Sequence, residues 1–216
     1  MEYQFARVDP SDPNLPSLAA QYKRLRLEAL KQSPHSFSST YETESQFPDD
    51  VWVSRLQHPR KETFVCVATL EGESEWVAQV TLRGPLCAEE FHLSESGQPP
   101  AAPDKEEEKW QMLSLYNLPS HRGKGLGKRL CKAACDFVVS RGGVAPTITV
   151  RCMVKPDNLA TLGMYQSLGF ERTGFCTLEE ALRANGDADM IPEGVLEKKF
   201  TTRTGIMLAL HLRREN

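Results

Sequence analysis

Residues 112–140 read MLSLYNLPSHRGKGLGKRLCKAACDFVVS, which is an apolar run, a glycine-rich turn and an amphipathic stretch in that order. The run from Met112 to Leu118 predicts a strand, and the stretch from Leu126 to Ser140 predicts a helix. At a helix start the backbone N–H groups have no partner within the helix, and glycines leave them uncovered. The segment from Arg122 to Gly127 therefore predicts an anion-binding site.

Three classes of glycine-rich loop could explain this segment, and two of them fail on spacing. A phosphate-binding Walker loop needs a glycine where Arg122 stands and a Ser or Thr where Arg129 stands. A dinucleotide fingerprint that begins at Gly123 would need a third glycine where Lys128 stands. The spacing that fits is R-x-x-G-x-G between a strand and a helix.

This arrangement resembles the acetyl-CoA-binding segment of the GCN5-related N-acetyltransferases (GNAT). A second similar segment follows about thirty residues later, with Asn158, then Tyr165, then Gly169-Phe170. The early stretch Leu25–Leu30 is also similar, whereas Asn117 stands where the family usually has valine. The resemblance implies an α/β fold over residues 1–216 as a single N-acetyltransferase domain, with a mixed, mostly antiparallel sheet flanked by helices on both faces.

The resemblance also implies acetyl-CoA as cosubstrate, with no metal. The residues that it implies for binding acetyl-CoA lie in both segments: Leu115, Tyr116, Asn117, Arg122, Gly123, Lys124, Gly125, Leu126, Gly127, Lys128, Asn158 and Tyr165. The cations among them, in a chain of net charge −3, suit a cofactor that carries several phosphates.

Periodicity and turn residues predict the remaining elements. The strands are expected at residues 3–8, 63–70, 76–82, 110–118, 147–154, from Phe170 and at 205–212, and the helices at 18–31, 48–56, 126–140 and 158–168. Residues 87–109 are acidic and rich in Pro, Gly and Ser, and we expect a mobile insertion there. Residues 175–204 are expected to form a long, irregular loop near the acceptor side.

The resemblance implies direct attack of an amine on the acetyl thioester. An alkylamine of pKa about 10.4 costs about 4–5 kcal/mol to deprotonate at pH 7, so a base or a water relay is expected. Glu28, Glu44 and Tyr116 are candidates for this base, and His121 is a weaker one. Tyr165 resembles the family tyrosine near the departing sulfur and is expected to donate a hydrogen bond to the developing thiolate.

Three functions remain open for this chain. The first is transfer of acetyl to the primary amine of a small molecule, and the second is acetylation of a protein lysine or N-terminus. An open groove lined by residues 36–41 and 175–204 would favour a peptide, and a closed cup would favour a metabolite. The third function is a non-catalytic CoA-binding module.

Composition narrows the class of protein further. A chain that is 40% hydrophobic and 25% charged is typical of a soluble globular protein, and its net charge argues against a nucleic-acid partner. It contains no apolar run of membrane length and no secretory signal, so we expect no membrane partner. The six cysteines lack metal-ligand spacing, which predicts reduced thiols in a cytoplasmic protein without a metal site. We expect the protein to be a monomer or a homodimer.

Overall fold

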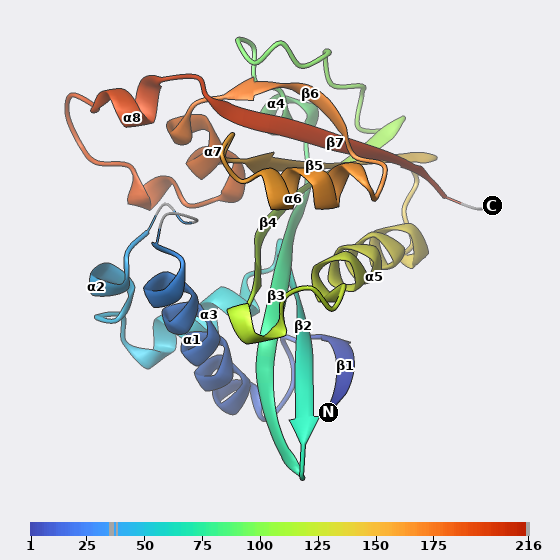
Figure 1. Cartoon of the computed structure of the whole chain (residues 1–216). Coiled ribbons are helices and arrows are strands. Elements are labelled where there is room, and N and C mark those ends of the chain that lie inside the picture. The colour runs from blue at the N-terminus through green and yellow to red at the C-terminus, as the bar shows by residue number, and fades with distance from the viewer. Residues whose placement is uncertain (35–36, 38, 215–216) are drawn as a thin grey trace. The chain divides into compact units, whose positions relative to one another are not determined.

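The computed structural model describes residues 1–34, 37 and 39–214. Their contacts divide the chain into two compact units, of which the first holds Met1–Leu82 and Ser114–Ala134 and the second holds Arg83–Leu113 and Cys135–Asn216. In chain order the elements are β1 (Glu2–Arg7), α1 (Leu15–Gln32), α2 (Tyr41–Glu44), α3 (Asp49–Gln57), β2 (Lys61–Leu70), β3 (Glu73–Leu86), α4 (Ala88–Phe91), β4 (Glu107–Asn117), η2 (Pro119–His121), α5 (Leu126–Ser140), β5 (Thr147–Val154), α6 (Leu159–Gln166), β6 (Glu171–Cys176), α7 (Leu178–Asn185), η3 (Ala188–Met190), α8 (Lys198–Thr201) and β7 (Gly205–Arg213) (Figure 1).

The strands hydrogen-bond in the order β1-β2-β3-β4-β5-β7-β6. The pair β4 and β5 is parallel, whereas β1 with β2, β5 with β7, and β6 with β7 are antiparallel. The expected α/β fold with a mostly antiparallel sheet flanked by helices is confirmed.

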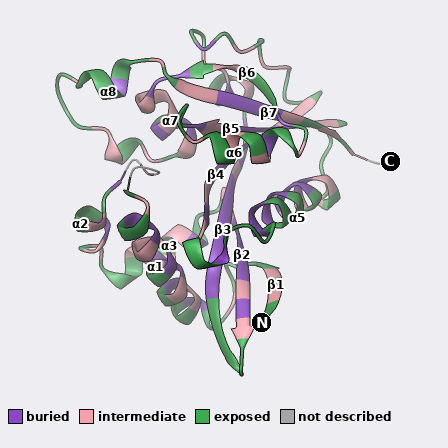
Figure 2. Ribbon diagram, in the orientation of Figure 1, coloured by how far each residue is buried: buried purple, intermediate pink, exposed green. Residues whose placement is uncertain are grey.

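Helix α1 supplies much of the core of the first unit. Leu15, Ala19, Tyr22, Leu25 and Ala29 recur every three to four residues, so they form one buried stripe on the helix. The stripe packs in one cluster with buried residues of four other elements, which are Trp52 of α3, Val65 of β2, Trp76 of β3 and Tyr116 of β4. Figure 2 colours the chain by burial and shows buried residues on α1 and along β2 and β3.

The two faces of β2 are covered by different helices. Val65 points into the cluster of α1 and α3, whereas the next residue, Cys66, lies near Arg129 of α5, whose charge acts to lower the pKa of the Cys66 thiol. Successive side chains of a strand point to opposite faces, so α1 and α5 cover opposite faces of β2. This arrangement holds the beginning of α5 against the strands of the first unit.

The turn between β2 and β3 is tighter than the sequence predicted. Glu71 and Gly72 both have positive φ, of 53° and 88°, which is the conformation of a two-residue hairpin turn. β3 therefore begins at Glu73, and the prediction that it begins at Trp76 is wrong. A glutamate at positive φ gives no signal that could be read from the sequence.

In the second unit, residues 175–204 are not irregular as expected, because they contain α7, η3 and α8. Thr177 and Glu180 form a capping box: the Thr177 hydroxyl accepts from the Glu180 N–H at 3.1 Å, and the Glu180 carboxylate accepts from the Thr177 N–H at 2.8 Å. Gly186 ends α7 at φ +76°. Both the capping box and the terminal glycine are signals that can be read from the sequence.

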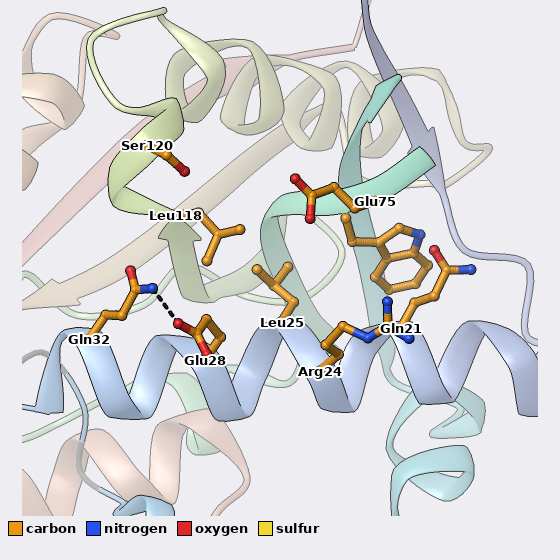
Figure 3. A pocket seen from close by; sticks show the side chains of 9 residues that line it. Gln21, Arg24, Leu25, Glu28, Gln32, Glu75, Leu118 and Ser120 are labelled. Atoms are coloured by element: carbon orange, nitrogen blue, oxygen red, sulfur yellow. Dashed lines mark hydrogen bonds between the residues drawn. The ribbon is translucent and has the colours of Figure 1, made fainter. Parts of the chain in front are cut away.

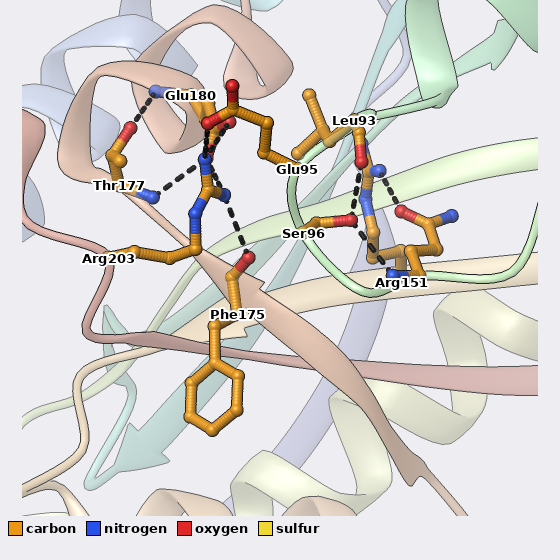
Figure 4. A network of polar contacts seen from close by, with 9 residues as sticks. Leu93, Glu95, Ser96, Arg151, Phe175, Thr177, Glu180 and Arg203 are labelled. Carbon is orange, nitrogen blue, oxygen red and sulfur yellow. Dashed lines mark hydrogen bonds and ion pairs between the residues drawn. The ribbon is translucent and has the colours of Figure 1, made fainter.

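The acidic segment contacts other strands of the second unit. Arg151 of β5 is buried and donates hydrogen bonds to the carbonyl of Phe91 and to Gln98 Oε1, the latter at 3.0 Å. The Ser96 carbonyl accepts from the Phe175 N–H of β6 at 2.8 Å. Figure 4 shows the side chains of Ser96 and Arg151 in this region of the second unit. β4 begins at Glu107, three residues before the predicted start at Trp110, so the end of the segment is part of the sheet.

Candidate functional site: an anion-binding loop

The glycine-rich turn follows β4 within the first unit. Gly123 and Gly125 have φ of +75° and +72°, a region that side chains disfavour. A Cβ atom at either position would meet nothing within 4 Å, so the space beside the turn is open. The two glycines are therefore needed for the backbone conformation, and they leave the turn accessible to a ligand.

The first turn of α5 presents backbone amides toward this loop. The Arg129 N–H donates to the Gly125 carbonyl at 3.1 Å, and the amides of residues 126–128 precede the first carbonyls of the helix. The Asn117 side chain, with its amide oriented to satisfy both groups, accepts from the Gly127 N–H at 3.2 Å and donates to the Tyr116 carbonyl at 3.0 Å. Asn117 thus ties the end of β4 to the start of α5.

Cations of the loop are held by uncharged groups. Arg122 donates to the Asn117 carbonyl at 3.2 Å and to the Ser33 hydroxyl at 3.1 Å, and Lys124 donates to the Tyr3 hydroxyl at 2.8 Å. Within residues 1–34, 37 and 39–214, neither cation has a carboxylate within 4 Å. Their charges are oriented but not neutralised, which suits a site for an anionic ligand.

Tyr116 carries a buried hydroxyl beside this loop. The residue is 6% exposed, its ring lies 5.5 Å from that of Phe37, and no described residue hydrogen-bonds to its hydroxyl. Leaving such a group unpaired costs about 1–3 kcal/mol, so a native structure keeps it for a reason. Ser36 and Ser38, part of the expected acceptor lining at residues 36–41, lie outside the described residues.

β4 changes conformation at a residue that the sequence did not single out. Ser114 has φ +55°, which is uncommon for a residue other than glycine and clusters at functional sites. The register of β4 with β5 ends at Met112, paired with Cys152. Residues 115–117, which the resemblance implies for binding acetyl-CoA, follow this irregularity.

The two acidic base candidates lie in different environments. Glu44 is fully buried between Arg26 and Arg55, with ion-pair distances of 2.6 and 2.7 Å. Burial works to raise the pKa of Glu44, yet the hydrogen bonds and charges of the two arginines hold it below its ordinary value. This arrangement makes Glu44 a weak base. Glu28, by contrast, accepts a hydrogen bond from the uncharged Gln32.

Glu28 also lines a pocket of the first unit with a volume of about 340 Å³. Side chains of α1, the beginning of β3 and the segment after β4 surround it (Figure 3). Its walls combine the apolar Leu25, Trp76 and Leu118 with the charged Arg24 and Glu75. Glu28 is therefore accessible to small solutes, which Glu44 is not.

His121, the weaker candidate, is 5% exposed, and its Nδ1 lies 3.0 Å from the Tyr3 hydroxyl. Burial, followed by the charge of Lys124, lowers the pKa of His121, while Glu75 opposes the shift. Burial and the charge of Lys124 therefore both favour the neutral form of the His121 imidazole.

The remaining predicted residues belong to the second unit. Asn158 caps α6, since its side-chain oxygen accepts from the Thr161 N–H at 3.2 Å. Tyr165 of α6 is 3% exposed, and its ring packs against Phe170 with centroids 5.0 Å apart.

The part of the chain that the structure describes holds no group of three or more His, Cys, Asp or Glu side chains that could bind a metal ion. No helix among the described residues is long and apolar enough to cross a bilayer.

The family model described as "Acetyltransferase (GNAT) family" matches residues 26–170, which is more than half of the chain. The fold is similar to that of Arabidopsis thaliana NAA60 in complex with a bisubstrate analogue (TM-score 0.58, 14% identity, 97% of this chain and 98% of that chain). It is also similar to the Escherichia coli ribosomal-protein-S18-alanine N-acetyltransferase (TM-score 0.53, 15% identity, 100% and 97%).

Two curated proteins share a short stretch with this chain. One is the N-alpha-acetyltransferase RimI of Mycobacterium tuberculosis (strain ATCC 25618 / H37Rv), 43% identical over 56 residues, which are 26% of this chain and 31% of that protein. The other is the mycothiol acetyltransferase of Renibacterium salmoninarum, 41% identical over 54 residues, which are 25% of this chain and 15% of that protein. The matched stretch thus spans less than a third of either relative.

Proposed function

Because the chain belongs to the acetyltransferase (GNAT) family, we propose that it is an acetyl-CoA-dependent N-acetyltransferase acting on a primary amine. The observation that carries this proposal is the anion loop, where Arg122 and Lys124 are held by uncharged oxygens beside the amides that begin α5. An anion at this loop would gain charge-assisted hydrogen bonds without displacing a carboxylate.

The loop residues fit the diphosphate of CoA. The amides of residues 123–126 and 128 would donate to its oxygens, since the Gly127 N–H already donates to Asn117, and Arg122 and Lys124 would supply the charge. The backbone of residues 115–117 would run beside the pantetheine arm. The helix dipole adds only about 0.3–1 kcal/mol, so most of the affinity comes from the cations and the amides.

Acetyl-CoA would supply an activated acetyl thioester that an acceptor amine attacks directly. Holding the two reactants together contributes several kcal/mol, with about 7–11 kcal/mol as the ceiling for ideal orientation. Of the two carboxylates expected as bases, Glu28 is the one we propose for accepting the proton, since the arginines around Glu44 weaken it as a base. Tyr165 would donate a hydrogen bond to the departing sulfur.

Two acceptor classes are supported by separate observations. Identity of 43% over 56 residues with a protein named N-alpha-acetyltransferase favours the α-amine of a peptide or protein. Identity of 41% over 54 residues with a mycothiol acetyltransferase favours the amine of a small molecule.

The test is release of free thiol from acetyl-CoA across a panel of amines. The panel contains peptides with a free α-amine, the same peptides Nα-acetylated with one internal lysine, and small primary amines, each assayed with the native protein and with Arg122→Ala. We expect turnover with one acceptor class and its loss in the variant. Stoichiometric binding of acetyl-CoA with no thiol released by any amine would instead identify a CoA-binding module.

A further inference from the structure

Lys124 of the glycine-rich turn contacts Tyr3, which lies on the N-terminal strand β1. Its Nζ atom donates to the Tyr3 hydroxyl at 2.8 Å, although the two residues are 121 positions apart in sequence. The Tyr3 hydroxyl in turn lies 3.0 Å from His121 Nδ1, and the two rings meet edge to face at 5.8 Å. Tyr3 of β1 therefore contacts Lys124 of the anion loop with its hydroxyl and with its ring, whose centroid lies 5.4 Å from Lys124 Nζ.

The donors and acceptors of this chain can be assigned from chemistry. A lysine ammonium only donates, so the Tyr3 oxygen must accept from Lys124. Tyr3 can then give its own proton to His121 Nδ1, which is a stronger acceptor than the sulfur of Met1, 3.0 Å from the same hydroxyl. This assignment needs the neutral tautomer of His121 with Nδ1 unprotonated, and burial favours a neutral imidazole.

A hydrogen bond to an uncharged hydroxyl orients an ammonium without neutralising its charge, which an ion pair with a carboxylate does. Lys23 and Lys109 are neutralised by Asp49 and Asp104, at 2.8 and 3.0 Å. Lys124 instead has no carboxylate within 4 Å among the described residues, and one of its three N–H bonds is fixed by Tyr3. The other two N–H bonds are then directed without the loss of rotamer freedom that an untethered lysine undergoes on binding.

A second contact between an aromatic residue of β1 and a cation lies two residues along the strand, although it involves the ring alone and no hydrogen bond. The guanidinium of Arg129 lies 4.2 Å from the centroid of the Phe5 ring. Residues 3 and 5 point to the same face of the strand, so this face of β1 holds one cation of the loop and one of α5, both through aromatic side chains. The pattern argues against an accidental contact of Tyr3.

We propose that Tyr3 is a positioning residue for the anion site, which holds the ammonium of Lys124 in place for a phosphate group of CoA. The inference rests on the proposed function, because it takes CoA as the anion. Strand β1 would then contribute to cofactor binding, although it lies far from the glycine-rich turn in sequence.

The experiment is a double-mutant cycle on CoA affinity, measured by calorimetry for the native protein, Tyr3→Phe, Lys124→Met and the double variant. Tyr3→Phe keeps the ring and removes only the hydroxyl, and it should raise the Kd for CoA about 3- to 10-fold. In the Lys124→Met background the same change should alter the Kd less than about twofold, because its effect passes through Lys124. The KM for acetyl-CoA should rise in parallel while kcat stays within about twofold.

Arg7→Ala is the matched control, since it removes the contact between Arg7 and Glu62 at 2.8 Å from the same strand. It should leave the Kd for CoA unchanged, and thermal unfolding of every variant should match the native protein. Native affinity in Tyr3→Phe, or an equal effect with and without Lys124, would overturn the role of Tyr3 alone. No heat when the native protein meets CoA would overturn the proposed function and this inference together.

Discussion

The guanidinium of Arg122 lies 5.6 Å from the centroid of the Tyr116 ring, and its Nε atom donates to the carbonyl of the next residue, Asn117. The last residues of β4 therefore orient the cation that the loop presents to an anion. Asn117 contributes twice, because its side chain also accepts from the Gly127 N–H at the start of α5. Strand, cation and helix start form one connected structure within the first unit.

Replacement of Arg122 tests the importance of this cation. Arg122→Ala should raise the Kd for CoA about 10- to 100-fold, the loss expected for charge-assisted hydrogen bonds to phosphate. Arg122→Lys should recover only part of the affinity, because an ammonium lacks the planar fork that reaches both Asn117 and Ser33. Calorimetry with CoA measures the effect. Arg183→Ala, which removes an exposed pair with Glu179, serves as control, and an equal loss there would exclude a specific role for Arg122.

Replacement of Tyr116 should have opposite effects on stability and on activity. Tyr116→Phe removes a buried hydroxyl without a described partner, so the free energy of unfolding should rise by about 1 kcal/mol. If the hydroxyl serves a ligand, kcat/KM should at the same time fall about 10-fold. Urea unfolding and steady-state kinetics measure the two effects. A variant that loses stability and keeps full activity would show that the hydroxyl has a structural partner.

Replacement of Glu44 should affect folding more than catalysis. Glu44→Gln leaves Arg26 and Arg55 without a counter-charge and should destabilise the protein by about 3 kcal/mol, the lower end for a broken buried pair, because both arginines keep some solvent contact. Since the folded pKa of Glu44 is lowered, its stabilisation is complete above the unfolded value of 4.5 and is lost as pH falls through the folded pKa.

Urea unfolding between pH 3 and pH 7 measures this dependence. The native protein should lose more stability than Glu44→Gln as the pH falls below about 4.5. Glu62→Gln removes a surface pair with Arg7 and should change stability by no more than about 1 kcal/mol. A Glu44→Gln variant of native stability with strongly reduced kcat would instead restore Glu44 as the general base.

The α/β class and the loop from Arg122 to Gly127 could be predicted from the sequence, because closely spaced glycines and a change from strand to helix periodicity are local signals. The structure gives Gly123 and Gly125 the positive φ that such glycines allow. It was insufficient wherever distant residues meet. Nothing in the sequence connects Tyr3 with Lys124, or Asn117 with Gly127, since these contacts depend on tertiary structure.

Two further features of the structure, the backbone conformation at Ser114 and helix α7, were not predicted, for different physical reasons. The left-handed backbone at Ser114 could not be predicted, because serine carries no preference for that conformation. Helix α7 could have been predicted, because Thr177 and Glu180 stand at capping-box spacing and Gly186 follows the helix. Helix α7 is short and amphipathic, and only Leu182 and Ala184 of it are buried, so its apolar periodicity is weak in the sequence.

Replacement of Tyr165 tests the proposed hydrogen bond to the departing sulfur. Tyr165→Phe should lower kcat about 10-fold and leave the KM for acetyl-CoA within about twofold, because the bond forms as the thiolate charge develops. Phe170→Leu, which changes the ring packed against Tyr165, is the control for altered packing. Retention of both kcat and cofactor affinity within twofold in Tyr165→Phe would show that the residue only packs.

The cysteines should differ sharply in reactivity toward an alkylating reagent. Burial raises the pKa of the Cys66 thiol to about 11 and, reinforced by the charge of Glu180, that of Cys176 to about 12, so both remain protonated at pH 8. Cys131, Cys135 and Cys152 are also buried, whereas Cys87 is exposed at the start of α4.

Iodoacetamide at pH 8 should therefore modify one thiol rapidly in the folded protein and all six after denaturation, as counted by intact mass. Cys87→Ser should abolish the rapid modification. Because the direct transfer proposed here uses no cysteine nucleophile, alkylated protein and Cys87→Ser should keep the native rate of thiol release from acetyl-CoA. Inactivation in step with modification of Cys87 would contradict direct attack by the amine and indicate an acetylated enzyme thiol.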